Sequence, residues 1–367
     1  MDHQGDIRHG IVNTLGRPLS AWASDPVVYQ AFCLDGPHAV EVRRRDFVLL
    51  VSSERGANAT FRFALNGSHA HIELVDISSD VGSRWRLVSA VFEYLFSSLP
   101  ALQSLVLKDE AWFGFRDELS RNGIWLQENA SATELVVLAD MFWQTTGLWT
   151  SSAPAAFPRH DIFDGRIAHP LRPSKPKGTV YARYIPWLGG LFSLDVATLD
   201  DLPIVHRWMN DPRVNEFWHE AGDEDRHRRY LEGMFADPHI MPLIGRFDGK
   251  AFAYFEVYWA KEDIVGTFCD AGDYDRGCHL IVGDEACRGR NWFTAWLPSL
   301  LHFMFLDDPR TQSIVQEPSS NHHRQLRNLQ KSGFSHVKSV NLPTKHAAIM
   351  AITRQRFFAD RLWHAAD

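Results

Sequence analysis

The clearest pattern of hydrophobic and polar positions lies between Asp275 and Phe334. A short apolar run at Cys278 to Val282 predicts a buried strand, and a basic loop with one glycine follows at Arg288 to Arg290. Apolar residues at helical spacing come next and predict a helix; they are Trp292, Trp296, Leu297, Leu300, Leu301, Met304 and Phe305. A strand at residues 311–316 and a polar helix that stops at Gly333 complete the unit.

The same order of elements is predicted in the first half of the chain. Alternating and apolar runs predict strands at residues 40–51, 60–65 and 71–77. A helix over 83–98, a strand at 104–107, a short helix ending near Asn122 and a strand at 134–141 follow. The two halves are also similar in sequence, because PALQSLV from Pro100 parallels PRTQSIV from Pro309, 209 positions later. We infer two copies of one fold; chance similarity of two helix-to-strand corners is the alternative.

The segment between the copies is rich in proline. Residues 151–178 hold five prolines, and because proline removes a hydrogen-bond donor and stiffens the chain, we expect an extended strap here. The expected organisation is an N-terminal domain at 1–150, the strap at 151–178 and a C-terminal domain at 179–367. Within the C-terminal domain, Thr198 with Asp201 predicts a helix start, and Asp248-Gly249 predicts a tight turn between two strands.

Composition narrows the class of protein. The chain has 367 residues, of which 45% are hydrophobic and 23% charged, as in a globular protein of two ordinary domains. A net charge of -7 argues against a general nucleic-acid binder. No basic start leads into an apolar run, so we expect a cytoplasmic protein without a membrane partner. The four cysteines form no CxxC pair and the histidines lack ligand-like spacing, so we expect no metal.

The basic loop before the second helix predicts an anion site. Backbone N–H groups and the positive end of a helix converge on such a loop, where Arg288 and Arg290 flank Gly289. A phosphate of a nucleotide or coenzyme is the natural occupant, and a plain solvated turn is the alternative. The first copy has Ser79-Asp80-Val81 at the corresponding place, where an acidic group would repel phosphate. We therefore expect the first copy to be non-catalytic.

This loop, followed by Asn321 and the pair Gly333-Phe334, resembles the Gcn5-related N-acetyltransferase superfamily, whose coenzyme A pyrophosphate sits on such a loop. The resemblance implies an α/β (α+β) fold, here as tandem copies with mixed central sheets flanked by helices. It implies acetyl-CoA or another acyl-CoA as co-substrate. The residues expected to hold the coenzyme are Ile281, Arg288, Gly289, Arg290 and Asn321.

A narrower resemblance covers about residues 159–358. YFEVYWAKED, DYDRGCHLIVG, RGRNWFTAWLPSLLHFMF, DDPRT and LPTKHAAIMAITRQRFF occur in the order found in hydroxamate-siderophore acetyltransferases of the aerobactin, alcaligin and rhizobactin type. Fungal hydroxyornithine transacylases are similar, and are also built from two such folds of which only the second is active. The resemblance implies acyl transfer from coenzyme A to the nitrogen of an N-hydroxylated lysine or diamine, which gives a hydroxamate. It also implies functional coupling to a flavin N-monooxygenase and a siderophore synthetase.

The expected catalytic residues are His279 and Glu317. His279 lies on the strand before the coenzyme loop, and imidazole titrates near neutral pH, so we expect it to be the general base; a structural histidine is the alternative. Glu317 is the expected orienter, unless it only braces its corner. A backbone N–H, that of Ile281, should polarise the thioester carbonyl. Five motif residues are expected either to line the acceptor pocket or to be structural: Glu256, Tyr258, Trp259, Asp275 and Arg276.

The donor that protonates the leaving thiolate is not evident in the sequence. The superfamily often has a tyrosine four residues before the Gly-Phe pair, and Leu329 stands there. Ser319, Ser320 and His322 are alternative donors, and a thiolate that leaves unassisted is another solution.

Two other classes of function stay open. An acetyltransferase of another amine, such as an aminoglycoside, would share the fold, and an acidic pocket formed by residues 216–225 would mark it. A catalytically silent acyl-CoA-binding scaffold would keep affinity for acetyl-CoA without turnover.

Overall fold

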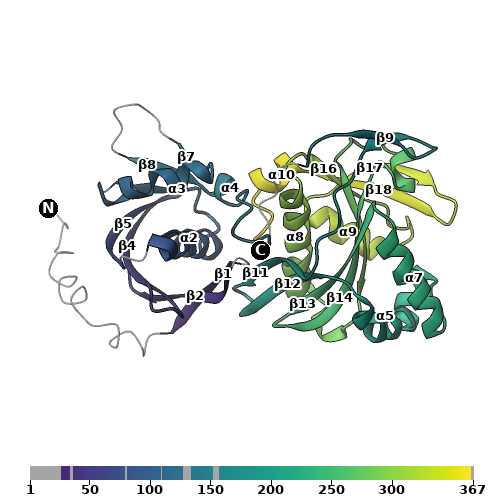
Figure 1. The fold of residues 1–367 in the computed structure, drawn as a ribbon, viewed down its shortest axis with the longest axis horizontal. Coiled ribbons are helices and arrows are strands. Elements are labelled where there is room, and N and C mark those ends of the chain that lie inside the picture. The colour runs from purple at the N-terminus through teal and green to yellow at the C-terminus, as the bar shows by residue number, and fades with distance from the viewer. Residues whose placement is uncertain are drawn as a thin grey trace. The chain divides into compact units, whose positions relative to one another are not determined.

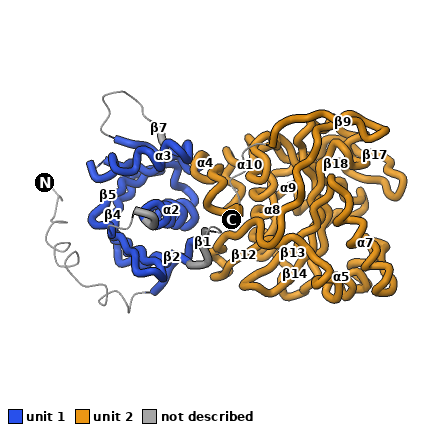
Figure 2. Tube along the Cα trace, in the orientation of Figure 1, with its two compact units in different colours: residues 1–31, 38–139 blue, residues 32–37, 140–367 orange. Residues whose placement is uncertain are grey.

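The computed structural model of the protein describes residues 26–33, 36–78, 81–108, 110–126, 134–151 and 157–364. The chain divides into two compact units, which meet in sequence between Ala139 and Asp140, with Phe32–Pro37 grouped with the second (Figures 1 and 2). Ser79 and Asp80, on which the comparison of the two loops rests, lie outside the described residues, as do residues 152–156 of the expected strap. Among the described residues, no helix is long and apolar enough to span a membrane.

The first unit is built on an eight-stranded sheet with the order β1-β2-β3-β4-β5-β6-β8-β7. Its strands are β1 (Val27–Cys33), β2 (Gly36–Arg45), β3 (Val48–Ser53), β4 (Asn58–Asn66), β5 (His69–Ile77), β6 (Ser104–Leu107), β7 (Trp125–Leu126) and β8 (Leu135–Leu138). Its helices are α2 (Val81–Ser98), η2 (Glu110–Phe115) and α3 (Arg116–Arg121), and α4 (Ala139–Phe142) lies at the boundary. The predicted single run at 40–51 is two strands, because Asp46 has a φ of 51° and turns the chain.

The second unit repeats this topology. Its sheet has the order β11-β12-β13-β14-β15-β16-β18-β17. The strands are β11 (Thr179–Ile185), β12 (Gly190–Val196), β13 (Ile240–Phe247), β14 (Lys250–Trp259), β15 (Arg276–Val282), β16 (Ser313–Gln316), β17 (Ser335–Asn341) and β18 (His346–Thr353). In each unit a parallel pair, β5–β6 or β15–β16, is connected by a helix, α2 or α8 (Arg290–Asp307).

The spacing of the repeat is preserved in the structure. Helices α2 and α8 both have 18 residues, and α8 begins 209 positions after α2. Strands β6 and β16 begin at Ser104 and Ser313, which are also 209 positions apart. The predicted tandem arrangement of two α/β folds is therefore confirmed.

The two units differ in the helices that follow the second strand. Between β12 and β13 the chain forms η3 (Leu199–Asp201), α5 (Leu202–Met209), α6 (Pro212–Trp218) and α7 (Glu224–Ala236). The predicted helix start is present, since Thr198 and Asp201 form a capping box. In the first unit, β2 passes directly into β3. The remaining elements of the second unit are η4 (Ile264–Thr267), η5 (Glu285–Cys287), α9 (His323–Lys331) and α10 (Arg354–Ala359).

Helices cover both faces of the second sheet. Helices α5 and α7 pack on one face, where their apolar residues form one core with Ile244, Tyr254 and Ile281. Helix α8 packs on the other face, where the Trp296 ring lies 5.8 Å from that of Phe255. Figure 1 shows the strands of this sheet between these two groups of helices.

Strands β15 and β16 separate soon after they begin to pair. Their parallel register is limited to Arg276↔Ile314 and Gly277↔Val315, whereas β15 pairs with β14 over its whole length. Beyond Gly277, the edge of β15 that faces β16 therefore has no neighbouring strand. This divergence leaves the backbone polar groups on that edge of β15 without partners on β16.

The proline-rich strap is not wholly extended. It contains a two-stranded hairpin of β9 (Asp161–Phe163) and β10 (Ala168–Pro170). The hairpin forms because Asp164 Oδ1 accepts hydrogen bonds from the backbone N–H groups of Arg166 and Ile167, at 2.7 and 2.8 Å, which closes the turn.

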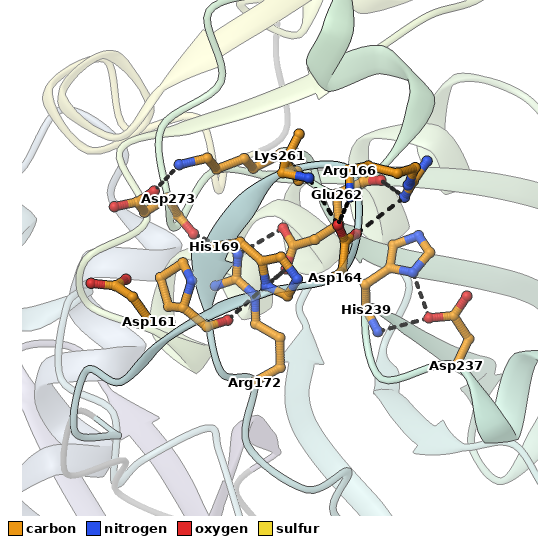
Figure 3. A network of polar contacts seen from close by, with 12 residues as sticks. Asp161, Asp164, Arg166, His169, Arg172, Asp237, His239, Lys261, Glu262 and Asp273 are labelled. Atoms are coloured by element: carbon orange, nitrogen blue, oxygen red, sulfur yellow. Dashed lines mark hydrogen bonds and ion pairs between the residues drawn. The ribbon is translucent and has the colours of Figure 1, made fainter.

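A buried ion pair fastens the strap to the second unit (Figure 3). Arg172 donates to both carboxylate oxygens of Glu262, at 2.5 and 2.8 Å, and to the Asp273 carbonyl oxygen at 2.7 Å. Its guanidinium lies 4.2 Å from the centre of the Trp259 ring. The side chains of Arg172 and Glu262 are only 2% and 4% exposed, so this pair is desolvated.

We predict that Arg172→Met destabilises the second unit by about 3–5 kcal/mol, because Glu262 then keeps a buried charge without its bidentate partner. The measurement is the shift of the urea unfolding curve. The double variant Arg172→Met/Glu262→Leu should recover most of the loss. Arg159→Ala is the control, since Arg159 and its partner Asp161 are about half exposed, and it should shift the curve little. Equal shifts for Arg172→Met and Arg159→Ala would contradict this role.

Candidate active site

Three ionisable residues form a row across adjacent strands on one face of the second sheet. Glu256 of β14 is the direct cross-strand partner of His279 of β15. Because Gly277 pairs with Val315, the parallel register places Glu317, the residue after β16, opposite His279 across the gap between the two strands. The predicted pair of His279 and Glu317 is therefore brought together, and Glu256 joins it as a second carboxylate.

Both ring nitrogens of His279 contact a carboxylate. Nδ1 lies 3.1 Å from Glu256 Oε2, and Nε2 lies 2.9 Å from Glu317 Oε1. Lys345 adds a longer contact, with its Nζ 3.4 Å from Glu317 Oε1. The imidazole thus bridges the two carboxylates.

Three tyrosines complete the hydrogen bonding of these carboxylates. Tyr230 of α7 and Tyr254 of β14 both donate to Glu256 Oε1, the latter at 3.0 Å. Tyr258 of β14 donates to Glu317 Oε2 at 2.8 Å. Burial and the adjacent carboxylates raise the pKa of all three phenols, so they are neutral donors at neutral pH.

Gly277 makes room for one of these tyrosines. A Cβ at Gly277 would lie 2.2–2.5 Å from atoms of the Tyr258 ring, including its hydroxyl oxygen. Since Gly277 and Tyr258 are cross-strand partners, the missing side chain lets the phenol lie flat across β15 and reach Glu317. Glycine is needed here for close approach.

The electrostatics of the row favour a protonated ring. Burial opposes protonation of His279, but the charge of Glu317 and the hydrogen bonds to both carboxylates outweigh it and raise the pKa of His279 well above its usual value. Burial also opposes ionisation of Glu317, but the charge of His279 outweighs it and lowers the pKa of Glu317 to about 2. The ring and Glu317 therefore form an imidazolium–carboxylate pair at neutral pH.

Of the three, only His279 is accessible to a substrate. Its side chain is 35% exposed, whereas those of Glu256 and Glu317 are 3% and 5% exposed. Trp218 of α6 lies beside it, with ring centres 6.4 Å apart. A substrate that enters this site therefore meets the imidazole, and the carboxylates act through it.

The predicted coenzyme loop lies at the start of α8. Gly289 is the N-cap of α8 and has a φ of 96°, a conformation that favours glycine. Arg290 is the first residue of the helix, and Asn321 is exposed in the turn before α9. Arg288 turns back along the loop, because its guanidinium donates to the Val282 carbonyl oxygen at 2.6 and 3.1 Å. A helix start of this kind can accept an anion.

The backbone of Ile281 does not face the gap beside β15. Successive residues of a strand direct their backbone polar groups to opposite sides. Trp218 Nε1 donates to the Leu280 carbonyl oxygen and Arg288 to that of Val282, whereas the Gly283 N–H donates to Phe252 of β14. Leu280 and Val282 thus face the gap, and Ile281 faces β14. Leu280 replaces Ile281 as the candidate for backbone contacts to a thioester.

Three of the residues expected either to line the acceptor pocket or to be structural make contacts within the second unit. Trp259 is held between two guanidinium groups, 4.2 Å from Arg172 and 4.0 Å from Arg276. Arg276 is buried and pairs with Asp307 at 2.8 Å. Asp275 accepts from the backbone N–H groups of Gly272 and Ser313, at 2.8 and 2.9 Å, and braces the start of β15. The sequence could not separate these contacts from substrate contacts, because each depends on a distant partner.

Sequence reasoning missed Trp218, the phenols of Tyr230 and Tyr254, and the contact of Lys345 with Glu317. Tyr230 reaches Glu256 from α7, 26 positions earlier in the chain, and Lys345 reaches Glu317 from the turn between β17 and β18. The local spacing of residues in the sequence does not predict such long-range contacts. The short alternation of Tyr254, Glu256 and Tyr258 was a usable signal, since period two places all three on one face of β14.

The positions considered as proton donors to the leaving thiolate differ in burial and in hydrogen bonding. Leu329 is buried and apolar, so the position of the usual tyrosine offers no proton. His322 is stacked on Phe217, with ring centres 4.3 Å apart, and burial lowers its pKa. Ser320 Oγ is buried and has no hydrogen-bond partner among the described residues.

Comparison with known proteins places the chain in a family. The acetyltransferase (GNAT) domain family matches residues 197–342. An N(5)-hydroxyornithine:cis-anhydromevalonyl coenzyme A-N(5)-transacylase of Beauveria bassiana is 38% identical over 69% of this chain and 57% of its own length. A hydroxyornithine transacylase of Ajellomyces capsulatus is 38% identical over 61% of this chain and 58% of its own. The N(6)-hydroxylysine O-acetyltransferase of Escherichia coli is 33% identical over 73% of this chain and 84% of its own.

The chain therefore belongs to the GNAT acyltransferase family that contains these hydroxyornithine and hydroxylysine enzymes, as its sequence motifs predict. It spans a little over half the length of the two fungal relatives. No group of three or more histidine, cysteine, aspartate or glutamate residues that could hold a metal ion occurs in the described part of the chain.

We predict that Gly277→Ala destabilises the second unit by about 1–3 kcal/mol, because the new methyl group overlaps the Tyr258 ring. Urea unfolding measures the effect. In a Tyr258→Leu background the same substitution should have a much smaller effect, since the ring is gone. Equal effects in the two backgrounds would show that Gly277 is needed for another reason.

Proposed function

We propose that this protein transfers the acyl group of an acyl-CoA, acetyl-CoA in the first instance, to the nitrogen of an N-hydroxylated lysine or diamine, giving a hydroxamate. The observation that carries the proposal is the exposed His279, bridged by two buried carboxylates and placed beside the unpaired edge of β15. A member of this family with that arrangement has an ionisable group at the place where a thioester and an amine would meet.

Each part of the site has a role in this reaction. The start of α8, with Gly289 and Arg290, would bind the coenzyme pyrophosphate through backbone N–H groups and charge. The backbone groups of Leu280 would hold the thioester arm along β15, and Asn321, exposed in the turn before α9, would contact the coenzyme. His279, paired with Glu317, would transfer the proton that the acceptor loses. Tyr258, Lys345 and Glu256 would position them.

The first unit serves a non-catalytic role in this proposal. Its β2–β3 turn stands where the second unit has α5, α6 and α7, so Trp218 and Tyr230 have no counterparts there. We place the catalytic domain at 179–367, the strap at 151–178 and the degenerate domain at 1–150.

Other enzymes must supply the acceptor and consume the hydroxamate product. An N-hydroxylated amine is made by oxygenation, as by a flavin N-monooxygenase, and a hydroxamate would pass to a siderophore synthetase. We expect these steps to be coupled in the cytoplasm, where acyl-CoA is available.

The aminoglycoside alternative lacks the acidic pocket that would support it. In the segment 216–225, Glu220 pairs with Arg226 at 2.8 Å, and Asp223 caps α7 by accepting from the Arg226 N–H at 2.8 Å. These carboxylates are used locally and are not gathered toward a polycationic ligand.

We predict that the protein consumes acetyl-CoA with one of N-hydroxylysine, N-hydroxyornithine, N-hydroxycadaverine or N-hydroxyputrescine, and not with the parent amines or kanamycin. Thiol release measures turnover, and the colour of the ferric complex separates a hydroxamate from an O-acetyl product. Succinyl-CoA and a longer acyl-CoA extend the panel.

His279→Ala should lower turnover about 10²–10⁴-fold, as expected for loss of a proton-transfer group. Turnover of kanamycin or of parent amines alone would refute the proposed acceptor. Binding of acetyl-CoA without turnover of any acceptor or donor would identify a silent scaffold.

We predict that Gly289→Ala weakens coenzyme A binding at least tenfold, because a side chain is strained at its φ of 96° and shifts the start of α8. Isothermal titration calorimetry measures the dissociation constant. Gly189→Ala is the matched control, since Gly189 also has a positive φ, of 66°, but lies in the β11–β12 turn. Equal loss of affinity in both variants would mean that general destabilisation is responsible.

A further inference from the structure

The hydrogen bonding of His279 fixes how many protons its ring carries. A neutral imidazole has one N–H, and its other nitrogen presents a lone pair. Both nitrogens of His279 lie at hydrogen-bond distance from carboxylate oxygens, 3.1 Å from Glu256 and 2.9 Å from Glu317. Beside two ionised carboxylates, a neutral ring would turn a lone pair toward one of two anions, so the contacts are satisfied when the ring carries two protons.

Among the described residues, the other groups around the two carboxylates are all hydrogen-bond donors, and none is an acceptor that a protonated carboxylate would need. From β14, Tyr254 donates to Glu256 and Tyr258 to Glu317; from α7, Tyr230 donates to Glu256. From the β17–β18 turn, Lys345 faces Glu317 at 3.4 Å. Every partner is a donor, as ionised carboxylates need. The ring is therefore the cation that bridges two buried anions.

We propose that His279 acts first as a general acid: its imidazolium protonates the leaving coenzyme A thiolate, and it becomes a base only afterwards. This inference rests on the proposed acyl transfer. It reverses the order that the sequence suggested, in which His279 starts as the base, and it supplies the thiolate donor that Leu329 cannot provide.

The reaction balances with this single residue. The acceptor nitrogen attacks the thioester carbonyl carbon, forming a C–N bond, a positively charged nitrogen and an oxyanion. As the C–S bond breaks, the Nε2 proton moves to sulfur and coenzyme A leaves as the thiol. The neutral ring then takes the proton from nitrogen, which restores the imidazolium. Nε2 is the donating atom because it faces β16 across the gap, whereas Nδ1 faces the interior strand β14.

A resting imidazolium also explains selection of the acceptor. An alkyl amine is an ammonium ion at neutral pH and needs a base before it can attack, as the pKa of about 10.4 for lysine shows. The accessible group here is already protonated and cannot serve. A hydroxylamine nitrogen is much less basic, is neutral at pH 7 and needs no prior deprotonation. The site therefore suits hydroxylamines and rejects their parent amines.

The first experiment reads the ring directly and does not depend on turnover. Histidine Cε1–Hε1 resonances of the full-length protein are followed from pH 5 to 10, and the His279 signal is assigned by its absence in His279→Gln. We expect imidazolium shifts at pH 7 that titrate only at higher pH. In Glu317→Gln the midpoint should fall by at least about one pH unit, because one anion is removed. A neutral ring at pH 7 in the wild type would overturn the proposal.

The second experiment reads the direction of proton transfer. With N-hydroxylysine, or whichever hydroxylated amine of the panel is turned over, kcat is measured over the same pH range. An acid works in its protonated form, so kcat should be level near neutral pH and fall as pH rises through the His279 midpoint. Glu317→Gln should move that fall to lower pH. An increase of kcat up to the His279 midpoint would show a base and overturn the proposal.

Ser320→Ala separates the competing donor. It should retain the wild-type pH profile if His279 protonates the thiolate. Loss of the alkaline limb in Ser320→Ala, with His279 still titrating in the NMR spectrum, would assign the acid to Ser320. Failure of the proposed function is distinct: no acceptor would be turned over, while the NMR titration would still report the imidazolium.

Discussion

The divergence of β15 and β16 is the constraint on which the active site depends. The strands pair at only two positions, so the register is set by Arg276 and Gly277 and then released. The release leaves Leu280 and Val282 with backbone groups facing a gap, and it puts Glu317 within reach of His279 from the far side of that gap.

The charges in the row support one another. Two carboxylates that are nearly fully buried are tolerated because a cationic ring and three phenols, with Lys345 close by, supply donors to their oxygens. Such a network is stable only when it is complete, which explains why Gly277 is kept small to admit Tyr258. At the C-terminal end of β14 and just beyond it, the strap holds Trp259 and Glu262 through Arg172. The strand that carries Glu256 is thus braced near its end.

The two units show how one topology can be kept while its connections differ. The strand order and the 18-residue central helix are retained in both. The helices α5, α6 and α7 occur in the second unit alone among the described residues, and they bring Trp218 and Tyr230 to the row. Sheet topology depends on the core, whereas chemistry depends on the connections.

The sequence by itself determined the repeat and most elements, and it suggested Glu317 as a partner of His279. The spacing of hydrophobic residues and the 209-residue offset between the two copies can be found within the sequence alone, and the order of the motifs identifies the family. Only the tertiary structure decided that Glu256 is a second partner of the ring, that Leu280 and not Ile281 faces the gap, and which distant partners Trp259, Asp275 and Arg276 contact. The physical reason is register: a shift of one residue moves a side chain to the other face of a sheet, and no local pattern fixes which distant strand lies opposite.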